Sequence, residues 1–134
     1  MVSAEGGIVD VGGSLPLAMY RRSHMIFITG PLFSGKKEYI RNALGLSEEA
    51  FFNRAIWDVQ DLADAADLES LADALAQKEI VIATEIGGGV VPVDPVERSH
   101  REAAGRLACL LAERADTVIR VNCGLPRALK GELP

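Results

Sequence analysis

The chain has 134 residues, of which 49% are hydrophobic and 25% charged, as in an ordinary globular domain with one core. Its net charge of -5 and the lack of a long basic run argue against a nucleic-acid or anionic-membrane surface. Two cysteines, Cys109 and Cys123, are too few for a disulfide framework, which favours a reducing cytoplasm. No apolar run reaches the roughly 18 residues that a membrane span needs.

Residues 1–24 differ from the rest of the chain. Pairs of glycines, Gly6-Gly7 and Gly12-Gly13, interrupt this stretch, and no helical or strand periodicity holds in it. We expect a flexible leader here, followed by one domain over residues 25–134. The alternative is a leader that covers a sheet edge.

The apolar run Met25 to Ile28 predicts a buried parallel strand. It leads into a stretch that fits seven of the eight positions of the phosphate-binding pattern GxxxxGK[ST]. In that pattern the backbone N–H groups, the start of the next helix and the lysine all face one anion. The expected nucleotide-binding residues are Gly30, Pro31, Leu32, Phe33, Ser34, Gly35, Lys36 and Lys37. The alternative is a plain glycine turn between a strand and a helix.

The eighth position of the pattern departs from it. Lys37 stands where a Ser or Thr hydroxyl would bind Mg²⁺. Phosphate binding is therefore better supported by the sequence than metal-assisted phosphoryl transfer.

Short elements are expected after the loop. Lys36 to Leu44 should form a helix ended by Gly45, and Ser47 should cap a short helix with Phe51 and Phe52 facing inward. A strand over residues 55–57 then ends at Asp58. A carboxylate at the carboxyl end of a strand is a candidate Mg²⁺ ligand, although Asp58 equally suits a helix N-cap or a solvated turn.

The middle of the chain predicts a helix from Asp61 to Gln77 and a central parallel strand from Ile80 to Thr84. Glu85 and a glycine-rich stretch follow that strand. Glycines permit close approach of a ligand, so Glu85, Gly87 and Gly89 are candidate site residues. The alternative is a mobile loop with a solvated Glu85.

A long helix is expected from about Val96 to Arg114, with Cys109 as a buried, inert thiol. Arg98 and Arg101 share a face of its first turns and could clamp a phosphate, or instead pair with neighbouring glutamates. His100 has no evident partner in the sequence and is interpreted as a surface residue. A last strand follows from Thr117 to Val121. The order of elements predicts an α/β fold: a small, P-loop NTPase-like open parallel sheet with helices on both faces.

The second half of the chain resembles a known family. The segment at residues 84–92, Thr-Glu-Ile-Gly-Gly-Gly-Val-Val-Pro, is followed at residues 97–106 by Glu-Arg-Ser-His-Arg-Glu-Ala-Ala-Gly-Arg. Both resemble adenosylcobinamide kinase/adenosylcobinamide-phosphate guanylyltransferase of cobalamin biosynthesis. Asp116, Val118, Val121, the Gly124-Leu125-Pro126 turn, Leu129-Lys130 and the phosphate loop continue the resemblance, which has a weak middle.

The resemblance implies two reactions at one nucleotide site. One phosphorylates the aminopropanol hydroxyl of the corrinoid adenosylcobinamide with ATP or GTP, and the other transfers GMP from GTP to the resulting phosphate. It implies catalytic roles for Lys36, Glu85, Arg98 and Arg101. We expect Glu85 to orient Mg²⁺ or accept the substrate proton, with Asp58 as the alternative. It also implies homo-oligomers, often trimers.

Four departures from the family pattern bear on this expectation. The family histidine that becomes guanylylated is absent, because His24 and His100 lie outside the corresponding interval. Thr84 replaces an asparagine, His100 an aromatic residue and Lys37 a hydroxyl. The kinase step is therefore the leading hypothesis. Its rivals are a nucleotide- or corrinoid-binding regulator without catalysis and a kinase for another small alcohol.

Overall fold

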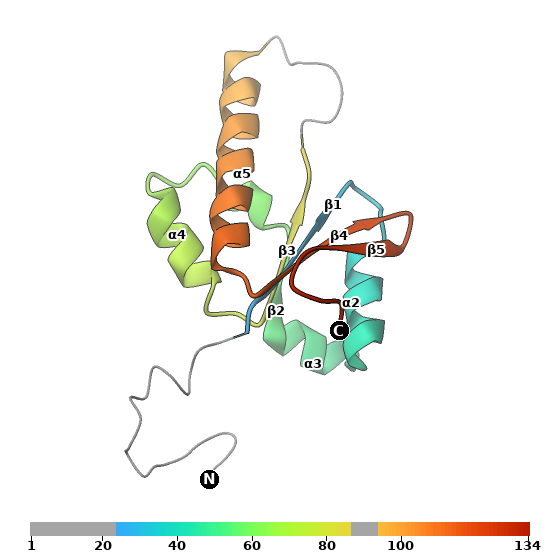
Figure 1. Ribbon diagram of the computed structural model, residues 1–134. Coiled ribbons are helices and arrows are strands. Elements are labelled where there is room, and N and C mark those ends of the chain that lie inside the picture. Colours follow the sequence, from blue (N-terminus) through green and yellow to red (C-terminus); the bar gives the residue numbers. More distant parts are fainter. Residues whose placement is uncertain (1–23, 87–93) are drawn as a thin grey trace, which may run out of the picture.

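A computed structural model describes residues 24–86 and 94–134. One mixed sheet carries the fold, with strands in the order β2-β3-β1-β4-β5. The strands are β1 (Ile26–Gly30), β2 (Ala55–Ile56), β3 (Ile80–Thr84), β4 (Thr117–Asn122) and β5 (Leu125–Lys130). The first four run parallel, and β1 lies between β3 and β4 (Figure 1).

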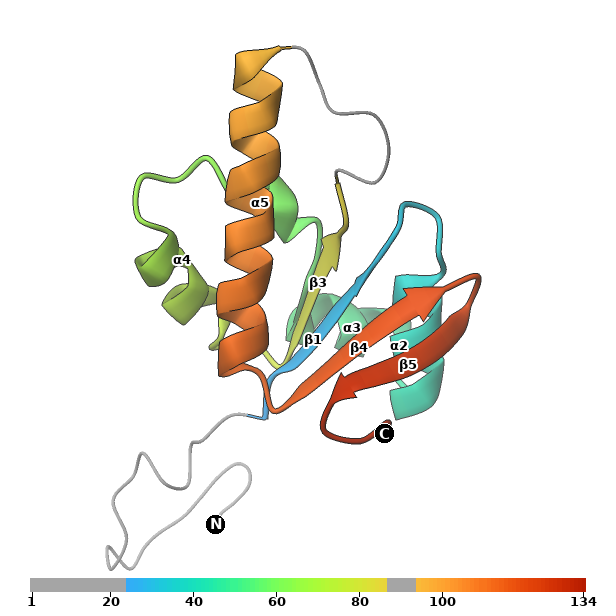
Figure 2. The ribbon, with the colours of Figure 1, turned by 45° about the horizontal axis from the view of Figure 1, so that its top comes forward.

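Helices cover both faces of this sheet, as the sequence predicts. The 3-10 helix η1 (Val59–Leu62), α4 (Leu68–Leu75) and α5 (Pro95–Arg114) cover one face, while α2 (Lys36–Leu44) and α3 (Glu48–Arg54) cover the other (Figure 2). Alternate strand residues point to opposite faces. Phe27 accordingly packs with Leu107 and Leu111, whereas its neighbour Ile28 packs with Ile40.

The expected parallel sheet gains one antiparallel strand. β5 pairs with β4 after a tight turn in which Cys123 and Gly124 have φ values of 55° and 76°. Lys130 Nζ donates to the carbonyl oxygens of Ala112 and Glu113 at 3.0 and 3.1 Å, which ties this edge strand to the end of α5.

The expected helix from Asp61 to Gln77 is wrong in its first half. The 3-10 helix ends at Leu62, and α4 begins only at Leu68. Asp67 is the reason for the late start, because its side chain accepts a hydrogen bond from Ser70 N at 3.2 Å and caps the helix there.

Two burial expectations are also wrong. Phe51 is buried, but Phe52 is 68% exposed and meets the edge of Trp57 instead of the core. Cys109 is exposed, because α5 turns Leu107 and Leu111 toward the sheet and this residue away from it. In the described part of the chain, no helix is long and apolar enough to cross a membrane.

Candidate functional site

The phosphate loop lies where β1 ends, at the carboxyl edge of the sheet. Gly30 has φ 155°, and a Cβ there would lie 2.2 Å from the carbonyl oxygen of Val121, so only glycine fits this exit from the strand. Phe33 and Gly35 have φ values of 61° and 87°, which curl the loop into the first turn of α2. The predicted order of strand, loop and helix is therefore present.

Hydrogen bonds fix the loop to its neighbours. Glu85 N donates to Gly30 O at 2.8 Å, and Gly124 N donates to Ser34 O at 2.7 Å. The loop is thus tied to the end of β3 on one side and to the turn between β4 and β5 on the other. Ser34 is 5% exposed, and its Oγ has no hydrogen-bond partner among the described residues.

Lys36 is the first residue of α2, and its ammonium folds back over the loop. Its Nζ donates to Pro31 O at 2.8 Å, and the residue is buried. Burial lowers the pKa of Lys36 below its usual 10.5; nearby Asp58 and Glu85 oppose that effect, and Lys37 adds to it. The structure therefore brings Lys36, Asp58 and Glu85 into one electrostatic neighbourhood.

Glu85 follows β3 and is held by a residue that the sequence analysis missed. Arg120 of β4 donates from Nε to Oε2 at 2.7 Å and from Nη2 to Oε1 at 2.8 Å. These hydrogen bonds lower the pKa of Glu85 below its usual 4.5, assisted by the charges of Arg120 and Lys36 and opposed by partial burial. Glu85 is thus ionised at neutral pH and a weak base, which disfavours its role as the proton acceptor.

Gln60 is a second residue that sequence reasoning missed. It lies buried in η1, and its Oε1 accepts a hydrogen bond from Thr84 N at 2.9 Å. This hydrogen bond fixes the position of Thr84, the last residue of β3, just before Glu85. Asp58 is exposed and precedes η1 with φ 56°, but its side chain makes no capping hydrogen bond, so the solvated turn residue fits and the helix N-cap does not.

The donor set around the loop does not fit a Mg²⁺ ion well. A P-loop enzyme holds that ion with a hydroxyl and a carboxylate. Here Lys37 replaces the hydroxyl, and Arg120 engages both oxygens of Glu85. Asp58 and, more weakly, Glu38 are the remaining carboxylates near Lys36. No group of three or more candidate ligand side chains occurs within residues 24–86 and 94–134.

The predicted arginine clamp lies on α5, whose first turns stand beyond the carboxyl end of β3 (Figures 1 and 2). Arg98 is exposed, and no hydrogen bond or ion pair joins it to Lys36 or Glu85 in the described segments. His100 has a partner that the sequence did not reveal, because its Nδ1 lies 3.0 Å from Asp64 Oδ1. Gly87 and Gly89 lie outside the described residues, so the clamp and the substrate loop remain predictions.

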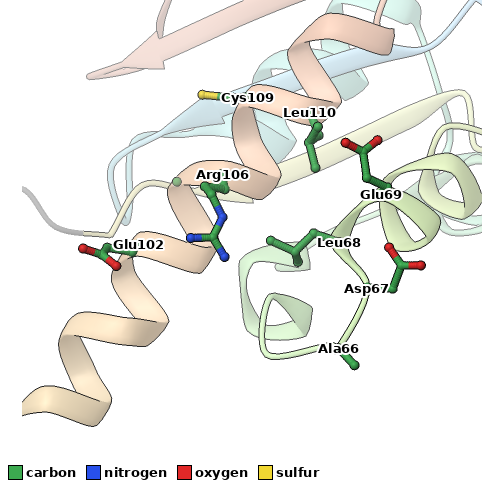
Figure 3. A pocket seen from close by; sticks show the side chains of 9 residues that line it. Ala66, Asp67, Leu68, Glu69, Glu102, Arg106, Cys109 and Leu110 are labelled. Atoms are coloured by element: carbon green, nitrogen blue, oxygen red, sulfur yellow. The ribbon is translucent and has the colours of Figure 1, made fainter.

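A separate open groove of about 960 Å³ lies between α4 and α5. Figure 3 shows Arg106 and Leu110 extending from α5 toward α4, where Leu68 lies. None of its lining residues belongs to the phosphate loop, so the groove is distinct from the site at the carboxyl edge of the sheet.

Comparison with known proteins decides the family. The model of the cobinamide kinase/cobinamide phosphate guanyltransferase family matches residues 42–129, which is more than half of the chain. The chain belongs to this family. The match begins within α2, so it includes Glu85 and Arg120, while the assignment of the phosphate loop depends on the loop's own pattern and geometry.

A curated relative agrees with this membership of the cobinamide kinase family. The bifunctional adenosylcobalamin biosynthesis protein CobP of Pseudomonas aeruginosa is 37% identical over 67 residues. The aligned region covers 48% of this chain and 39% of the relative, so the chain matches well under half of that protein's length.

Proposed function

We propose that the protein is a nucleotide-dependent kinase that phosphorylates the aminopropanol hydroxyl of adenosylcobinamide. The observation that carries this proposal is the loop from Gly30 to Lys36, which curls at the carboxyl end of β1 and leads directly into α2. Backbone N–H groups at a helix start attract phosphate. Ser34 Oγ, buried and without a partner among the described residues, is the kind of atom that a ligand oxygen would satisfy.

We propose one role for each part of this site. The loop amides and Lys36 bind the β- and γ-phosphates of ATP or GTP, since such catalysis consists chiefly of positioning and charge stabilisation. Glu85, kept ionised and oriented by Arg120, positions the substrate beside Lys36. Arg98 and Arg101 bind the product phosphate. Such a kinase would work in the cytoplasm and, as in the family it resembles, as a homo-oligomer.

Guanylyl transfer through a histidine intermediate is not part of the proposal. The chain has two histidines. His24 lies next to Asp116, at the amino ends of β1 and β4 and thus at the opposite end of the sheet from the phosphate loop. His100 belongs to α5, and its side chain is hydrogen-bonded to Asp64. Neither residue lies in the segment between α2 and β3.

A second candidate function is a nucleotide- or corrinoid-binding regulator of the same pathway without catalysis. Two observations favour it: Lys37 replaces the metal-binding hydroxyl, and Arg120 occupies both carboxylate oxygens of Glu85. Both reduce the means of binding a catalytic metal ion.

The test is mass analysis of adenosylcobinamide after incubation with the protein and either ATP or GTP, with and without Mg²⁺. The kinase proposal expects the corrinoid to gain one phosphate. Nucleotide binding without any product would favour the regulator instead. Phosphorylation of a different small alcohol, but not of the corrinoid, would redirect the proposal to another substrate.

A further inference from the structure

Lys37 occupies the position of the missing hydroxyl, and its ammonium has a defined location. Its Nζ lies 4.7 Å from the centroid of the Trp57 ring. Phe51 stacks on this ring at 5.5 Å and Phe52 meets its edge at 5.9 Å, so the aromatic cluster is built from α3 and the end of β2. Cation–π contacts at exposed sites are weak, and Lys37 is exposed. A bound anion such as a phosphate would therefore attract the ammonium of Lys37 more strongly than the Trp57 ring does.

The position of Lys37 favours an anion next to it. Lys37 is the second residue of α2, where the helix dipole is positive and disfavours a cation. It also lies close enough to Lys36 to lower the pKa of that residue. Two consecutive lysines thus begin α2, with the ammonium of Lys36 on Pro31 O and that of Lys37 over the Trp57 ring. A bound polyphosphate would relieve their mutual repulsion.

The same charges oppose a divalent cation. An added Mg²⁺ would meet the positive charges of Lys36 and Lys37. It would find only Asp58 and the more weakly acting Glu38 as carboxylates among the groups that shift the pKa of Lys36, since Arg120 already engages Glu85. At the position where the phosphate-binding pattern has a metal-binding hydroxyl, this loop therefore has a second ammonium group, that of Lys37.

We propose that Lys37 takes the place of the metal-binding hydroxyl as a second phosphate-binding ammonium, so that a nucleoside triphosphate binds tightly without a divalent cation. On binding, Lys37 leaves the ring of Trp57 for the phosphates. This inference depends on the proposed nucleotide site, and it adds how that site neutralises the charge of its ligand.

Trp57 is the single tryptophan of the chain, so its fluorescence reports directly on Lys37. The experiment titrates the full chain with GTP in EDTA and, separately, in excess Mg²⁺, and follows both Trp57 emission and heat. We expect dissociation constants within about threefold of each other in the two buffers. We also expect a saturable change of Trp57 emission in both.

Lys37→Thr restores the hydroxyl of the pattern and removes the second ammonium. Its affinity for GTP in EDTA should fall at least about tenfold, because a charge-assisted contact is lost, and Mg²⁺ should recover part of it. Lys78→Thr is the matched control, since Lys78 lies near the amino end of β3 and contacts Asn53 O. Circular dichroism of each variant establishes that it is folded.

The outcomes separate this inference from the function on which it depends. Wild-type binding that requires Mg²⁺ would overturn the inference and leave the nucleotide site standing. If Lys37→Thr binds GTP in EDTA as tightly as the wild type does, Lys37 is not a phosphate-binding residue and the inference is overturned. A protein that binds no GTP in either buffer would overturn both the inference and the proposed function.

Discussion

Arg120 and Glu85 reach each other across the carboxyl end of β1. Arg120 belongs to β4 and Glu85 follows β3, the two strands that flank β1, and two hydrogen bonds of 2.7 and 2.8 Å join their side chains. The pair therefore lies beside the start of the phosphate loop, where Glu85 N also donates to Gly30 O. Arg120 is a positioning residue for a carboxylate that the sequence alone marks as a site candidate.

Replacing Arg120 by methionine tests this positioning role. The pKa of the Glu85 carboxyl should rise toward its usual 4.5, because the hydrogen bonds that lower it are lost. A ¹³C-detected pH titration of the glutamate side chains measures this. Corrinoid phosphorylation should fall in parallel, and Arg120→Lys should restore it partly, since one ammonium cannot make the bidentate contact. Arg54→Met removes an exposed arginine that pairs with Glu79 near the amino end of β3, away from the site, and is the control.

The same pair predicts how stability depends on pH. The pKa of Glu85 is lower in the folded protein than in the unfolded chain, so the contribution of the pair to stability is present above pH 4.5. It is lost as the pH falls through the lowered pKa. Urea unfolding between pH 3 and 7 should therefore show a smaller acid-induced loss of stability in Arg120→Met than in the wild type. If the free energy of unfolding depends on pH in the same way in both proteins, the Glu85–Arg120 pair does not form in solution.

Glu85→Gln keeps the size of the side chain but removes its charge. We expect a severe loss of phosphoryl transfer with little change in the unfolding midpoint, because Glu85 and Arg120 are both more than a third exposed and such pairs stabilise the fold only weakly. Steady-state kinetics and thermal unfolding measure the two effects. Undiminished turnover would exclude Glu85 from the reaction.

Lys36→Met should weaken nucleotide binding without unfolding the protein. Hydrogen bonds to charged groups contribute about 1.5–3 kcal/mol, so affinity for GTP should fall about 10- to 100-fold. Calorimetry measures this, with Lys78→Met as a control of the same chemistry at the other end of the sheet. Since burial lowers the pKa of Lys36, wild-type affinity should also decline with rising pH before 10.5 is reached. Equal affinities of the two variants for GTP would argue against nucleotide binding by the phosphate loop.

Gly30→Ala should destabilise the fold. The added Cβ would lie 2.2 Å from Val121 O, and a backbone φ of 155° is strained for any other residue. Strain and overpacking each cost about 1–3 kcal/mol. Gly105→Ala is the opposite case, because nothing lies within 4 Å of the Cβ position in the middle of α5. It should stabilise the protein by up to about 1 kcal/mol. Chemical unfolding of both variants tests the contrast.

The sequence predicts the core elements well because their signals are local. β3 matches the predicted strand, and α2 and α5 begin and end within a residue of expectation, since glycine and proline mark their limits. β5 was missed because it contains Pro126 and is mostly exposed, so it has no alternating burial pattern. Its structure depends on pairing with β4, which no local pattern encodes.

The sequence predicts the phosphate loop of the candidate site, but not the side-chain contacts around it. Gly30, Gly35 and Lys36 follow from a spacing pattern, whereas the partner of Glu85 depends on which strands flank β1. One signal for Arg120 was present in the sequence: a charged residue between the apolar Ile119 and Val121 in the middle of β4. Similarly, the contact of Lys37 with Trp57 joins residues 20 positions apart through the packing of α3 against α2.

The most direct test of the central claim is an amide NMR titration of the ¹⁵N-labelled chain with GTP. If the loop binds the nucleotide phosphates, the largest shifts should fall on the amides of residues 32–37, together with Gly124, whose N–H donates to Ser34 O. At a GTP concentration that half-saturates the wild type, Lys36→Met should strongly reduce these shifts. Shifts confined to the groove between α4 and α5, or no shifts in residues 32–37 at saturating GTP, would contradict the claim.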